Sequence, residues 1–480
     1  MSKTEHNVDL CVIGAGSGGL SVAAGAAMLG RSVVLYEAGK MGGDCLNYGC
    51  VPSKALIAAG KHAQYPRDGA PYGVEPVRKV NVDFEAVKAH IKGVIETIAP
   101  VDSQERFEGL GCIVIREHAR FRDVRTVESE TTEVRAKRFV VSTGSRASAP
   151  PIPGLADTPY LTNEDIFDVD VLPDRLLVIG AGPIGLELGQ SFRRLGSEVE
   201  IFDIVAPLGR SEPEHAEVLV EQLKSEGIVF HAPAETKQIS GDRDGVTIEL
   251  GDGTKVEGSH LLVAAGRRPF MDGLELENAG VEHDRRGIKT DDCLRTSNKR
   301  VFAVGDVAAG MGGLTHAAGY HAGVIIKAFY FLPPIINRIA GKATTDRMPA
   351  AIYTEPELAS IGMTEAQARE KHGNVRVVKW EFEENDRAIA ERSTHGGVRI
   401  VATKGGKILG ASVVGDGAGD IIQMMSVAMT NKVRISGLAQ IISPYPTRGE
   451  AIKRASSSFY ADTIFGPKAK AFAGFLSRFH

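Results

Sequence analysis

A glycine-rich segment that separates an apolar run from a helical pattern occurs twice in this chain. The segments Leu10–Gly19 (LCVIGAGSGG) and Leu176–Gly185 (LLVIGAGPIG) start 166 residues apart (176 − 10), and the match continues beyond them without a gap. A single Gly-x-Gly-x-x-Gly segment is weak evidence of function, but both copies lie between a predicted strand and a predicted helix. An acidic residue, Glu37 or Asp203, follows each copy at the same spacing. The repeat therefore predicts two βαβ units that bind dinucleotides.

The glycines of each copy have separate tasks in such a unit. The first permits a tight turn, the second lets a pyrophosphate approach the backbone, and the third lets the helix pack on the strand. Free N–H groups at the positive end of the helix would then hold the pyrophosphate. We expect Glu37 and Asp203 to accept hydrogen bonds from ribose hydroxyls. The glycines concerned are Gly14, Gly16 and Gly19 in the first copy, and Gly180, Gly182 and Gly185 in the second.

Apolar runs outside the two copies indicate the domain organisation. Two runs are followed by proline-containing crossings, and a third, Val301–Asp306, ends on a carboxylate. The third run suggests that the chain returns to the first sheet, with the second unit inserted into the first. We expect an α/β fold with two Rossmann-like dinucleotide-binding domains and a C-terminal α+β domain. The expected ranges are 1–150 and 275–345 for the first domain, 151–274 for the second and 346–480 for the third.

The C-terminal range has a different pattern. Residues 397–402 and 408–414 predict antiparallel strands joined across Gly405-Gly406, and residues 421–432 predict a helix. Methionines 424, 425 and 429 on this helix are interpreted as core filler rather than as a ligand site.

Two cysteines five positions apart, Cys45 and Cys50, follow the first fingerprint in the segment GGDCLNYGCVPSK. Residues i and i+5 lie about 140° apart around a regular helix, so the thiols meet only if the turn is distorted. Gly49 supplies local freedom and Asn47 tolerates unusual dihedral angles. We expect a strained, reducible disulfide beside a redox cofactor.

Composition excludes several other classes of protein. The formal net charge of −4 gives no reason to expect a nucleic-acid partner. No apolar run approaches the roughly 20 residues that span a bilayer, and the N-terminus leads directly into a predicted strand, so we expect no signal peptide. Cys11, Cys112 and Cys293 are interpreted as buried or incidental thiols of a reducing compartment. We therefore expect a cytoplasmic location, and no metal site is predicted.

These landmarks together resemble the class I flavoprotein disulfide reductases, which include dihydrolipoamide dehydrogenase, glutathione reductase and mercuric reductase. The resemblance extends from the first fingerprint to Glu450. It implies that the first fingerprint binds FAD, that the second binds a nicotinamide dinucleotide, and that residues 346–480 form a homodimer with active sites built from both subunits. The further cofactor-binding residues that it implies are Gly43, Thr143, Gly144, Gly266, Asp306, Leu314 and Thr315.

The resemblance also implies a path for the electrons. Hydride would pass from the reduced nicotinamide to the flavin, and electrons would then enter the disulfide. Cys50 would be the thiolate that faces the flavin and Cys45 the thiol that attacks the substrate. Lys54 and Glu187 would pair near the flavin, and the positive end of a helix opening at Leu314-Thr315 would stabilise the reduced flavin. His316 is interpreted as a helix-start residue rather than a catalytic base.

The end of the second βαβ unit favours NADH as the electron donor. Asp203 would repel a 2′-phosphate, residues 204–207 are uncharged, and no arginine follows before Arg210. NADPH stays open as the alternative.

The chain departs from its disulfide-reducing relatives near the C-terminus. Where they carry His-Pro-Thr…Glu, this chain reads SPYPTRGE, so Tyr445 replaces the histidine while Glu450 is retained. Tyrosine titrates near pH 10 and histidine near 6.5, so we expect slow exchange with ordinary disulfides. Mercuric reductases also have a tyrosine there, but they carry a C-terminal cysteine pair, and no cysteine follows Cys293 here.

The acceptor is therefore left open among four alternatives. A dihydrolipoamide dehydrogenase-like dithiol or disulfide, small or protein-borne, comes first, and a mercuric reductase-like metal-thiolate acceptor second. Another electrophile such as a quinone, or an FAD-binding redox sensor with slow turnover, completes the set. The apolar positions Phe472, Phe475, Leu476 and Phe479 have helical spacing, and we expect this helix to dock on its own dimer rather than touch a membrane.

Overall fold

The computed structural model describes residues 3–77, 79–311, 313–333 and 341–479. The chain forms two compact units, which are described separately. The first contains residues 1–204 and 229–345, and the second contains residues 205–228 and 346–480. The second unit thus includes residues 205–228, which lie within the range expected for the second domain. The expected domain boundaries stay predictions.

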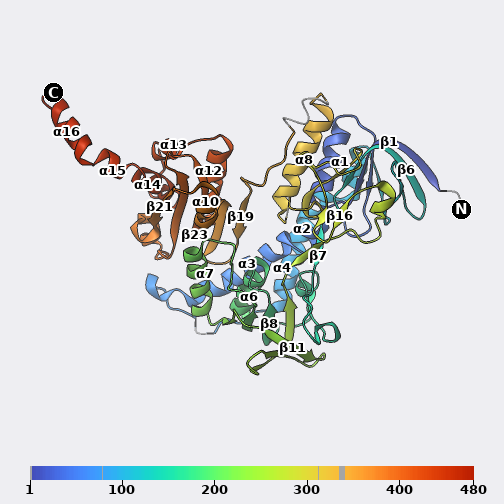
Figure 1. Ribbon diagram of the computed structural model, residues 1–480. Coiled ribbons are helices and arrows are strands. Elements are labelled where there is room, and N and C mark those ends of the chain that lie inside the picture. Colours follow the sequence, from blue (N-terminus) through green and yellow to red (C-terminus); the bar gives the residue numbers. More distant parts are fainter. Residues whose placement is uncertain (1–2, 78, 312, 334–340, 480) are drawn as a thin grey trace. The chain divides into compact units, whose positions relative to one another are not determined.

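The first unit is built on a seven-stranded sheet whose buried strands carry the first fingerprint (Figure 1). Its strands are β1 (Thr4–Ile13), β2 (Val33–Tyr36), β3 (Cys112–Ile115), β4 (Arg120–Asp123), β5 (Thr126–Glu128), β6 (Thr132–Val141) and β18 (Val301–Ala303). The order is β3-β2-β1-β6-β5-β4, and β18 pairs with β6 in parallel. The chain thus returns to its first sheet after the second fingerprint, as the sequence predicted.

Helices cover this sheet and position the first fingerprint. They include α1 (Ser17–Met28), α5 (Gln104–Gly109) and α8 (Thr315–Tyr330). The α1 and α8 helices lie side by side (Figure 1), and their small residues allow close packing: a Cβ on Gly18 would lie 3.3 Å from the Cβ of Ala318. One face of β1 and β2 packs with the buried side chains of α1 in one continuous core, and the other face belongs to a separate core.

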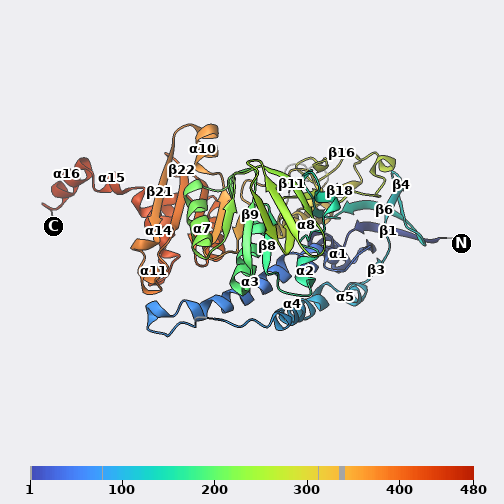
Figure 2. The same cartoon turned by 90° about the horizontal axis from the view of Figure 1, so that it is seen from below.

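The second fingerprint belongs to a four-stranded parallel sheet with the order β10-β9-β8-β14. Its strands are β8 (Arg175–Ile179), β9 (Glu198–Phe202), β10 (Val229–His231) and β14 (His260–Val263). Helix α6 (Pro183–Leu195) follows β8 and packs on α3 (Cys50–Gln64), which also contacts α4 (Phe84–Ile98) (Figure 2). Both fingerprints therefore have the strand–turn–helix context that the dinucleotide-binding interpretation requires.

Smaller sheets complete the first unit. Strands β11 (Thr236–Gly241), β12 (Val246–Leu250) and β13 (Lys255–Gly258) form an antiparallel sheet. Two-stranded sheets join β7 (Ser145–Ala147) to β15 (Arg267–Pro269), and β16 (His283–Asp284) to β17 (Gly287–Ile288). The β7–β15 pair joins the segments that follow β6 and β14, one strand from each of the two parallel sheets.

The second unit is a five-stranded antiparallel sheet with helices, so it has the α+β character that was expected. Its strands are β19 (Pro349–Ile352), β20 (Glu357–Gly362), β21 (Val375–Glu381), β22 (Gly397–Thr403) and β23 (Ile408–Gly415), in the order β19-β20-β23-β22-β21. Its helices are α7 (Pro213–Ser225), α10 (Glu365–His372), α11 (Asp386–Ala390), α12 (Ala418–Thr430), α13 (Ile435–Ala439), α14 (Glu450–Ser458), α15 (Ala461–Ile464) and α16 (Pro467–Leu476).

Local predictions for the second unit are confirmed. β22 and β23 pair as predicted, and α12 occupies the predicted helix. Met425 is fully buried in the core of this unit, while Met424 and Met429 pack against it. These methionines fill the core, as the sequence indicated.

One strand prediction was wrong at its end. β18 stops at Ala303, and Asp306 lies in a 3₁₀ turn, Gly305–Val307, rather than on the strand. The reason is local, because Gly305 takes a positive φ of 70° and turns the chain away from the sheet.

Two predictions from composition can be compared with the structure. Within the described ranges, the helices are too short or too polar to cross a membrane. Cys11, Cys112 and Cys293 are buried free thiols, as interpreted.

Candidate functional site

The two fingerprint turns have the same backbone geometry. The first glycines, Gly14 and Gly180, have φ values of 102° and 114°. An added Cβ on the third glycine would lie 1.9 Å from the carbonyl oxygen of the first, at Gly19 in one copy and at Gly185 in the other. Both positions therefore require glycine, for conformation in one case and for close packing in the other.

The helices that follow these turns have N-termini suited to a pyrophosphate. Helix α1 begins after Gly16 and helix α6 after Gly182, and neither has a side-chain cap or an acidic residue in its first turn. A Cβ on Gly182 would meet nothing within 4 Å, so the approach to α6 is open. The backbone N–H groups and the positive end of each helix are thus available to an anion. The residues present fit two dinucleotides.

The acidic residues after each fingerprint have a structural task that sequence reasoning missed. Glu37 accepts a hydrogen bond from the Ala15 N–H (2.7 Å), and Asp203 accepts one from the Ala181 N–H (2.8 Å). Each carboxylate therefore holds the turn of its own copy. Their contacts with ribose hydroxyls stay predictions.

The cysteine pair lies where one helix ends and the next begins. Cys45 is in α2 (Gly43–Asn47), Cys50 is the first residue of α3, and the chain between the helices breaks at Tyr48 and Gly49. Both cysteines are free thiols, so the structure represents the reduced pair. The thiols meet because the helix is interrupted, not because a single turn is distorted.

Asn47 and Gly49, which lie between the cysteines, do not have the conformational roles that the sequence suggested. Asn47 stays helical, and its side-chain amide donates to the carbonyls of Met41 (2.9 Å) and Gly43 (2.8 Å). Gly49 is needed for space rather than for a left-handed conformation, since an added Cβ would lie 2.8 Å from Asp44 Oδ2.

The two thiols differ in acidity. The pKa of Cys50 is lowered to about 6 by a hydrogen bond with Cys45, by a hydrogen bond with Thr315 (Sγ···Oγ1, 3.2 Å) and by the charge of Lys54. The pKa of Cys45 is raised, first by its hydrogen bond with Cys50 and then by burial. The negative charge of the reduced pair therefore resides on Cys50, which is also exposed.

The Lys54 ammonium is held beside the pair by a partly buried ion pair. Its Nζ lies 2.8 Å from Oε2 of Glu187, whose side chain is buried on α6. Helix α3 thus presents both a thiol and a cation near the first fingerprint. The start of α2 also lies against the first fingerprint. Gly43 has a φ of 61°, and a Cβ on it would lie 2.7 Å from the Gly16 Cα.

Asp306 is joined to the β7–β15 pair by hydrogen bonds. Its Oδ2 accepts from Ser145 Oγ (2.6 Å) and its Oδ1 accepts from the Gly313 N–H (3.0 Å). Arg267 donates from Nε to Ser145 Oγ (2.9 Å), and its Nη2 lies 3.0 Å from Asp44 Oδ1. Sequence reasoning missed Asp44, Ser145, Arg267 and Asn163, whose Nδ2 donates to Asp44 Oδ1 (3.1 Å). Only the position of Asp44 next to Cys45 could have indicated one of them.

Other predicted cofactor residues surround this network. Gly144 and Gly266 have positive φ values of 69° and 149°, and Thr143 Oγ1 donates to the Phe270 carbonyl (2.5 Å). Leu314 precedes the first turn of α8, which begins at Thr315 and has no side-chain cap. No side chain caps this helix start, so its positive end is suited to stabilising a negative group. Their roles in binding a cofactor stay predictions.

The sequence analysis also missed His321, a buried residue of α8. The ring Nδ1 of His321 accepts a hydrogen bond from the Gly305 N–H (3.2 Å), and burial lowers the pKa of His321. Neutral His321 therefore holds the turn that carries Asp306.

Tyr445 and Glu450 lie in the second unit, and each forms a hydrogen bond with a third residue rather than with the other. Tyr445 is 69% exposed and donates from its hydroxyl to Asp386 Oδ2 (2.9 Å). This hydrogen bond raises the pKa of Tyr445. Glu450 begins α14 and accepts from Arg454 Nε (2.9 Å). Tyr445 is therefore held in its protonated form and is a poor base.

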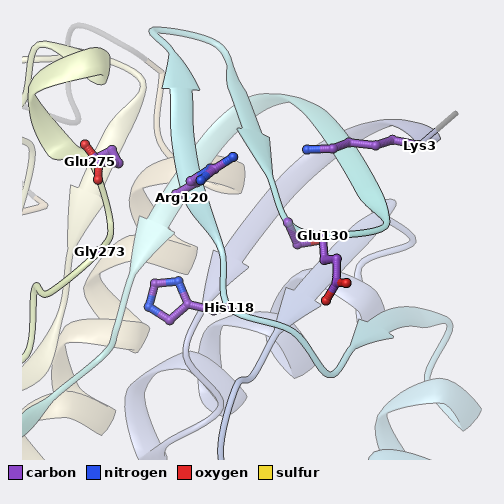
Figure 3. A pocket seen from close by; sticks show the side chains of 7 residues that line it. Lys3, His118, Arg120, Glu130, Gly273 and Glu275 are labelled. Carbon is purple, nitrogen blue, oxygen red and sulfur yellow. The ribbon is translucent and has the colours of Figure 1, made fainter. Parts of the chain in front are cut away.

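A surface cavity of about 610 Å³ lies against the seven-stranded sheet (Figure 3). Lys3, His118 and Arg120 line it together with Glu130 and Glu275. Lys3 and Arg120 both pair with Glu128, so the cavity holds internally balanced charges and none of the predicted site residues. Among the described residues, no cluster of three or more His, Cys, Asp or Glu side chains is arranged to hold a metal ion.

Comparison with protein families covers most of the chain. Residues 8–322 match the pyridine nucleotide-disulphide oxidoreductase family, and residues 348–456 match the dimerisation domain of that family. Mercuric reductase of Streptomyces lividans is 33% identical over 475 residues, which cover 96% of this chain and 98% of the relative. Mercuric reductase of Bacillus cereus is 34% identical over 467 residues, or 95% of this chain and 72% of the relative.

Other relatives carry different names. Dihydrolipoyl dehydrogenase of Haloferax volcanii is 32% identical over 477 residues, which cover 95% of this chain and 97% of the relative. Among solved structures, the Cu(II) complex of the HOCl-induced flavoprotein disulfide reductase RclA from Escherichia coli matches with a TM-score of 0.80. It is 25% identical and covers 94% of this chain and 99% of that chain. The protein is thus a member of the pyridine nucleotide-disulphide oxidoreductase family, an FAD-dependent oxidoreductase that takes electrons from NAD(P)H.

Proposed function

We propose that this protein reduces a thiophilic metal ion with electrons that reach the Cys45–Cys50 pair from NAD(P)H. The observation that carries the proposal is Tyr445, which stands where disulfide-reducing relatives have a histidine. Its hydroxyl is committed to Asp386, and its pKa is raised further from neutrality. A disulfide substrate needs a proton for its leaving thiolate, whereas a metal ion needs none. The acceptor best suited to this site is therefore one that accepts electrons without a proton.

The residues of this chain divide the work. FAD, when bound, relays two electrons between NAD(P)H and sulfur. The Cys50 thiolate is stabilised by Thr315 and by the Lys54 charge, and Glu187 keeps the Lys54 ammonium in place. Cys45 holds the remaining proton, because its pKa is raised. When two electrons leave the sulfurs, for one Hg²⁺ ion or for two Cu²⁺ ions, a Sγ–Sγ bond forms and the Cys45 proton is released.

The remaining assignments support the same enzyme. We infer that NADH is the preferred donor, because Asp203 directly follows β9 and would repel a 2′-phosphate. The dimerisation domain supports a homodimer whose sites use Tyr445 and Glu450 of the second copy. The three buried free cysteines support a reducing compartment such as the cytoplasm.

A disulfide acceptor is the second candidate, and it is the one that the sequence placed first. Its support is Glu450, which keeps the acidic half of the family motif, and the similarity to dihydrolipoyl dehydrogenases. In this case the missing proton donor would make turnover slow.

A panel of acceptors tests the proposal. Purified FAD-loaded protein is given NADH or NADPH and then Hg²⁺ or Cu²⁺ with excess thiol, lipoamide, glutathione disulfide or a quinone, and nicotinamide oxidation is followed. We expect a metal ion to exceed both disulfides by at least about tenfold in kcat/KM. Faster turnover with a disulfide than with either metal would refute the metal assignment.

Substitution of Tyr445 separates the two candidates further. Tyr445→His should raise turnover with disulfides by about 10- to 100-fold, within the range of general acid–base catalysis, and should change metal reduction little. Tyr445→Phe is the matched control, because it removes the hydroxyl without adding a base. If Tyr445→Phe abolishes metal reduction, the hydroxyl takes part in that reaction and the argument from its inertness fails.

A further inference from the structure

The chain between the two redox cysteines is held in place by side chains from outside the helix pair. Asn163 donates from Nδ2 to the Tyr48 carbonyl (3.1 Å) and to Asp44 Oδ1 (3.1 Å). The Asp44 carboxylate in turn lies against Gly49, where an added Cβ would come within 2.8 Å of Oδ2. The interruption at Tyr48 and Gly49 is therefore fixed by Asp44 and Asn163.

Arg267 connects these residues to the β7–β15 pair. Its Nη2 lies 3.0 Å from Asp44 Oδ1 and its Nη1 donates to Asn163 Oδ1 (3.3 Å). Its Nε and Nη2 also donate to Ser145 Oγ (2.9 Å) and to the Ser145 carbonyl (2.8 Å). A guanidinium bound at these points has one position, so its charge stays beside Asp44.

Two ion pairs lie near the cysteine pair, and they act on Cys50 with charges of opposite sign. Lys54 acts on Cys50 as a cation and has Glu187 as its partner, while Asp44 acts as an anion and has Arg267 as its partner. Hydrogen bonds from Cys45 and Thr315 and the charge of Lys54 lower the pKa of Cys50, while burial and then the charge of Asp44 raise it. Asp306, which accepts from Ser145, is the next carboxylate along the network.

We propose that the Asp44–Arg267 ion pair sets the reduction equilibrium of the Cys45–Cys50 pair. The disulfide is neutral, whereas the reduced pair carries a thiolate, so a nearby carboxylate raises the free energy of the reduced form alone. Asp44 therefore favours the disulfide, and Arg267 is a positioning residue that limits this effect by neutralising Asp44. The proposal rests on the redox role of the cysteine pair given above, but not on the identity of the acceptor.

The equilibrium can be written with dithiothreitol as the reductant. Dithiothreitol loses two electrons and two protons and closes to its cyclic disulfide. The Sγ–Sγ bond of the protein breaks and takes up the two electrons, one proton goes to Cys45, and Cys50 stays a thiolate. The second proton is released to the solvent.

The test measures this equilibrium in the FAD-loaded protein with the variants Asp44→Asn and Arg267→Met. Samples are equilibrated in buffers of reduced and oxidised dithiothreitol, quenched in acid and alkylated after denaturation. The chain has five cysteines, so the oxidised pair gives three labels by mass and the reduced pair gives five.

The two variants should shift the equilibrium in opposite directions. We expect Asp44→Asn to favour the reduced form by about tenfold and Arg267→Met to favour the disulfide by a similar factor, each about 30 mV. A purely structural role would instead move both variants in the same direction, because both lose the same contact. Shifts of the same sign, or none beyond threefold, would overturn the proposal.

Matched controls use the neighbouring charges. Arg267→Lys keeps the positive charge and should shift the equilibrium less than Arg267→Met does. Arg268→Met removes the adjacent arginine of β15, which pairs with Asp272 instead, and should not shift the equilibrium. If Arg267→Met does not retain FAD, Arg267→Gln takes its place with the same expected direction.

The result is independent of the acceptor. If the acceptor panel selects a disulfide rather than a metal ion, the labelling result still decides the present proposal. If the wild type never changes between three and five labels, the redox role of the pair itself is refuted, and this proposal falls with it.

Discussion

At the scale of single residues, the site depends on charges that the fold places next to sulfur. Cys50 begins a helix, lies 3.2 Å from the Thr315 hydroxyl and has the Lys54 charge near it. These contacts favour a thiolate, and the same contacts would be weak in a solvent-exposed peptide. The cysteine side chain supplies the thiol, while the neighbouring residues determine whether the Cys50 thiol is protonated.

The acidity of Cys50 leads to a prediction about alkylation. The pKa of Cys50 is lowered to about 6, so its thiolate is present above pH 6 and is lost as the pH falls through that value. In the reduced protein, the rate of iodoacetamide alkylation at Cys50 should have its midpoint near pH 6, instead of near 8.5 for an ordinary cysteine. Peptide mass mapping measures the rate at this position.

Thr315→Val provides the comparison for this profile. The variant loses the hydroxyl that contacts the sulfur and should raise the midpoint by about half a unit to one unit. A midpoint that stays above pH 8 in the wild type, or that does not rise in the variant, would contradict the assignment of the thiolate.

At the scale of elements, the glycines of the second strand–turn–helix unit have different structural roles. Gly185 packs against the Gly180 carbonyl, and Gly182 faces open space. The first supports the turn from within, whereas the second leaves room for a ligand. The sequence motif does not show which glycine is needed for packing and which leaves room for a ligand, whereas the structure does.

This separation predicts opposite phenotypes for two alanine substitutions in α6 and its cap. Gly185→Ala would place a Cβ 1.9 Å from the Gly180 oxygen and should cost about 1–3 kcal/mol by overpacking, seen as a lower Tm. Gly182→Ala meets no protein atom and has an ordinary φ of −87°, so Tm should hold while the KM for NAD(P)H rises. Thermal scanning and steady-state kinetics measure the two effects. A fall in Tm for Gly182→Ala with unchanged KM would reverse the assignment.

At the scale of the whole molecule, the second unit exposes apolar side chains that a single chain does not cover. Ile442 is 96% exposed and lies three residues before Tyr445, inside the range matched by the dimerisation domain. Exposed aliphatic residues next to functional ones are typical of surfaces buried by a partner. The segment that carries Tyr445 is therefore expected to be covered in the homodimer.

Substitution of Ile442 tests this expectation. Ile442→Asp should convert a dimer into a monomer at micromolar concentration, because a carboxylate would be buried without a partner. Light scattering after size-exclusion chromatography measures the mass. Val171→Asp is the control, since Val171 is 62% exposed but lies outside the dimerisation domain. An Ile442→Asp protein that remains a dimer would place the interface elsewhere.

The sequence by itself determined the local units of this protein. Gly14 and Gly180, the buried strands beside them, the acidic residues at equal spacing and the antiparallel strands of the second unit follow from periodicity and from the φ values that only glycine adopts readily. These are short-range constraints, so pattern reasoning reached them. The spacing of Cys45 and Cys50 likewise indicated sulfur chemistry, because both residues lie in one short segment.

Only the tertiary structure decided what surrounds the cysteine pair. Asp44, Asn163, Ser145 and Arg267 are far apart in the chain, and no periodicity joins them, yet hydrogen bonds bring them together behind the helix break. The interruption between Cys45 and Cys50 is also held by a long-range contact, from Asn163 to the Tyr48 carbonyl. Charge acts through space, so the electrostatics of the pair depend on distances that the order of residues does not contain.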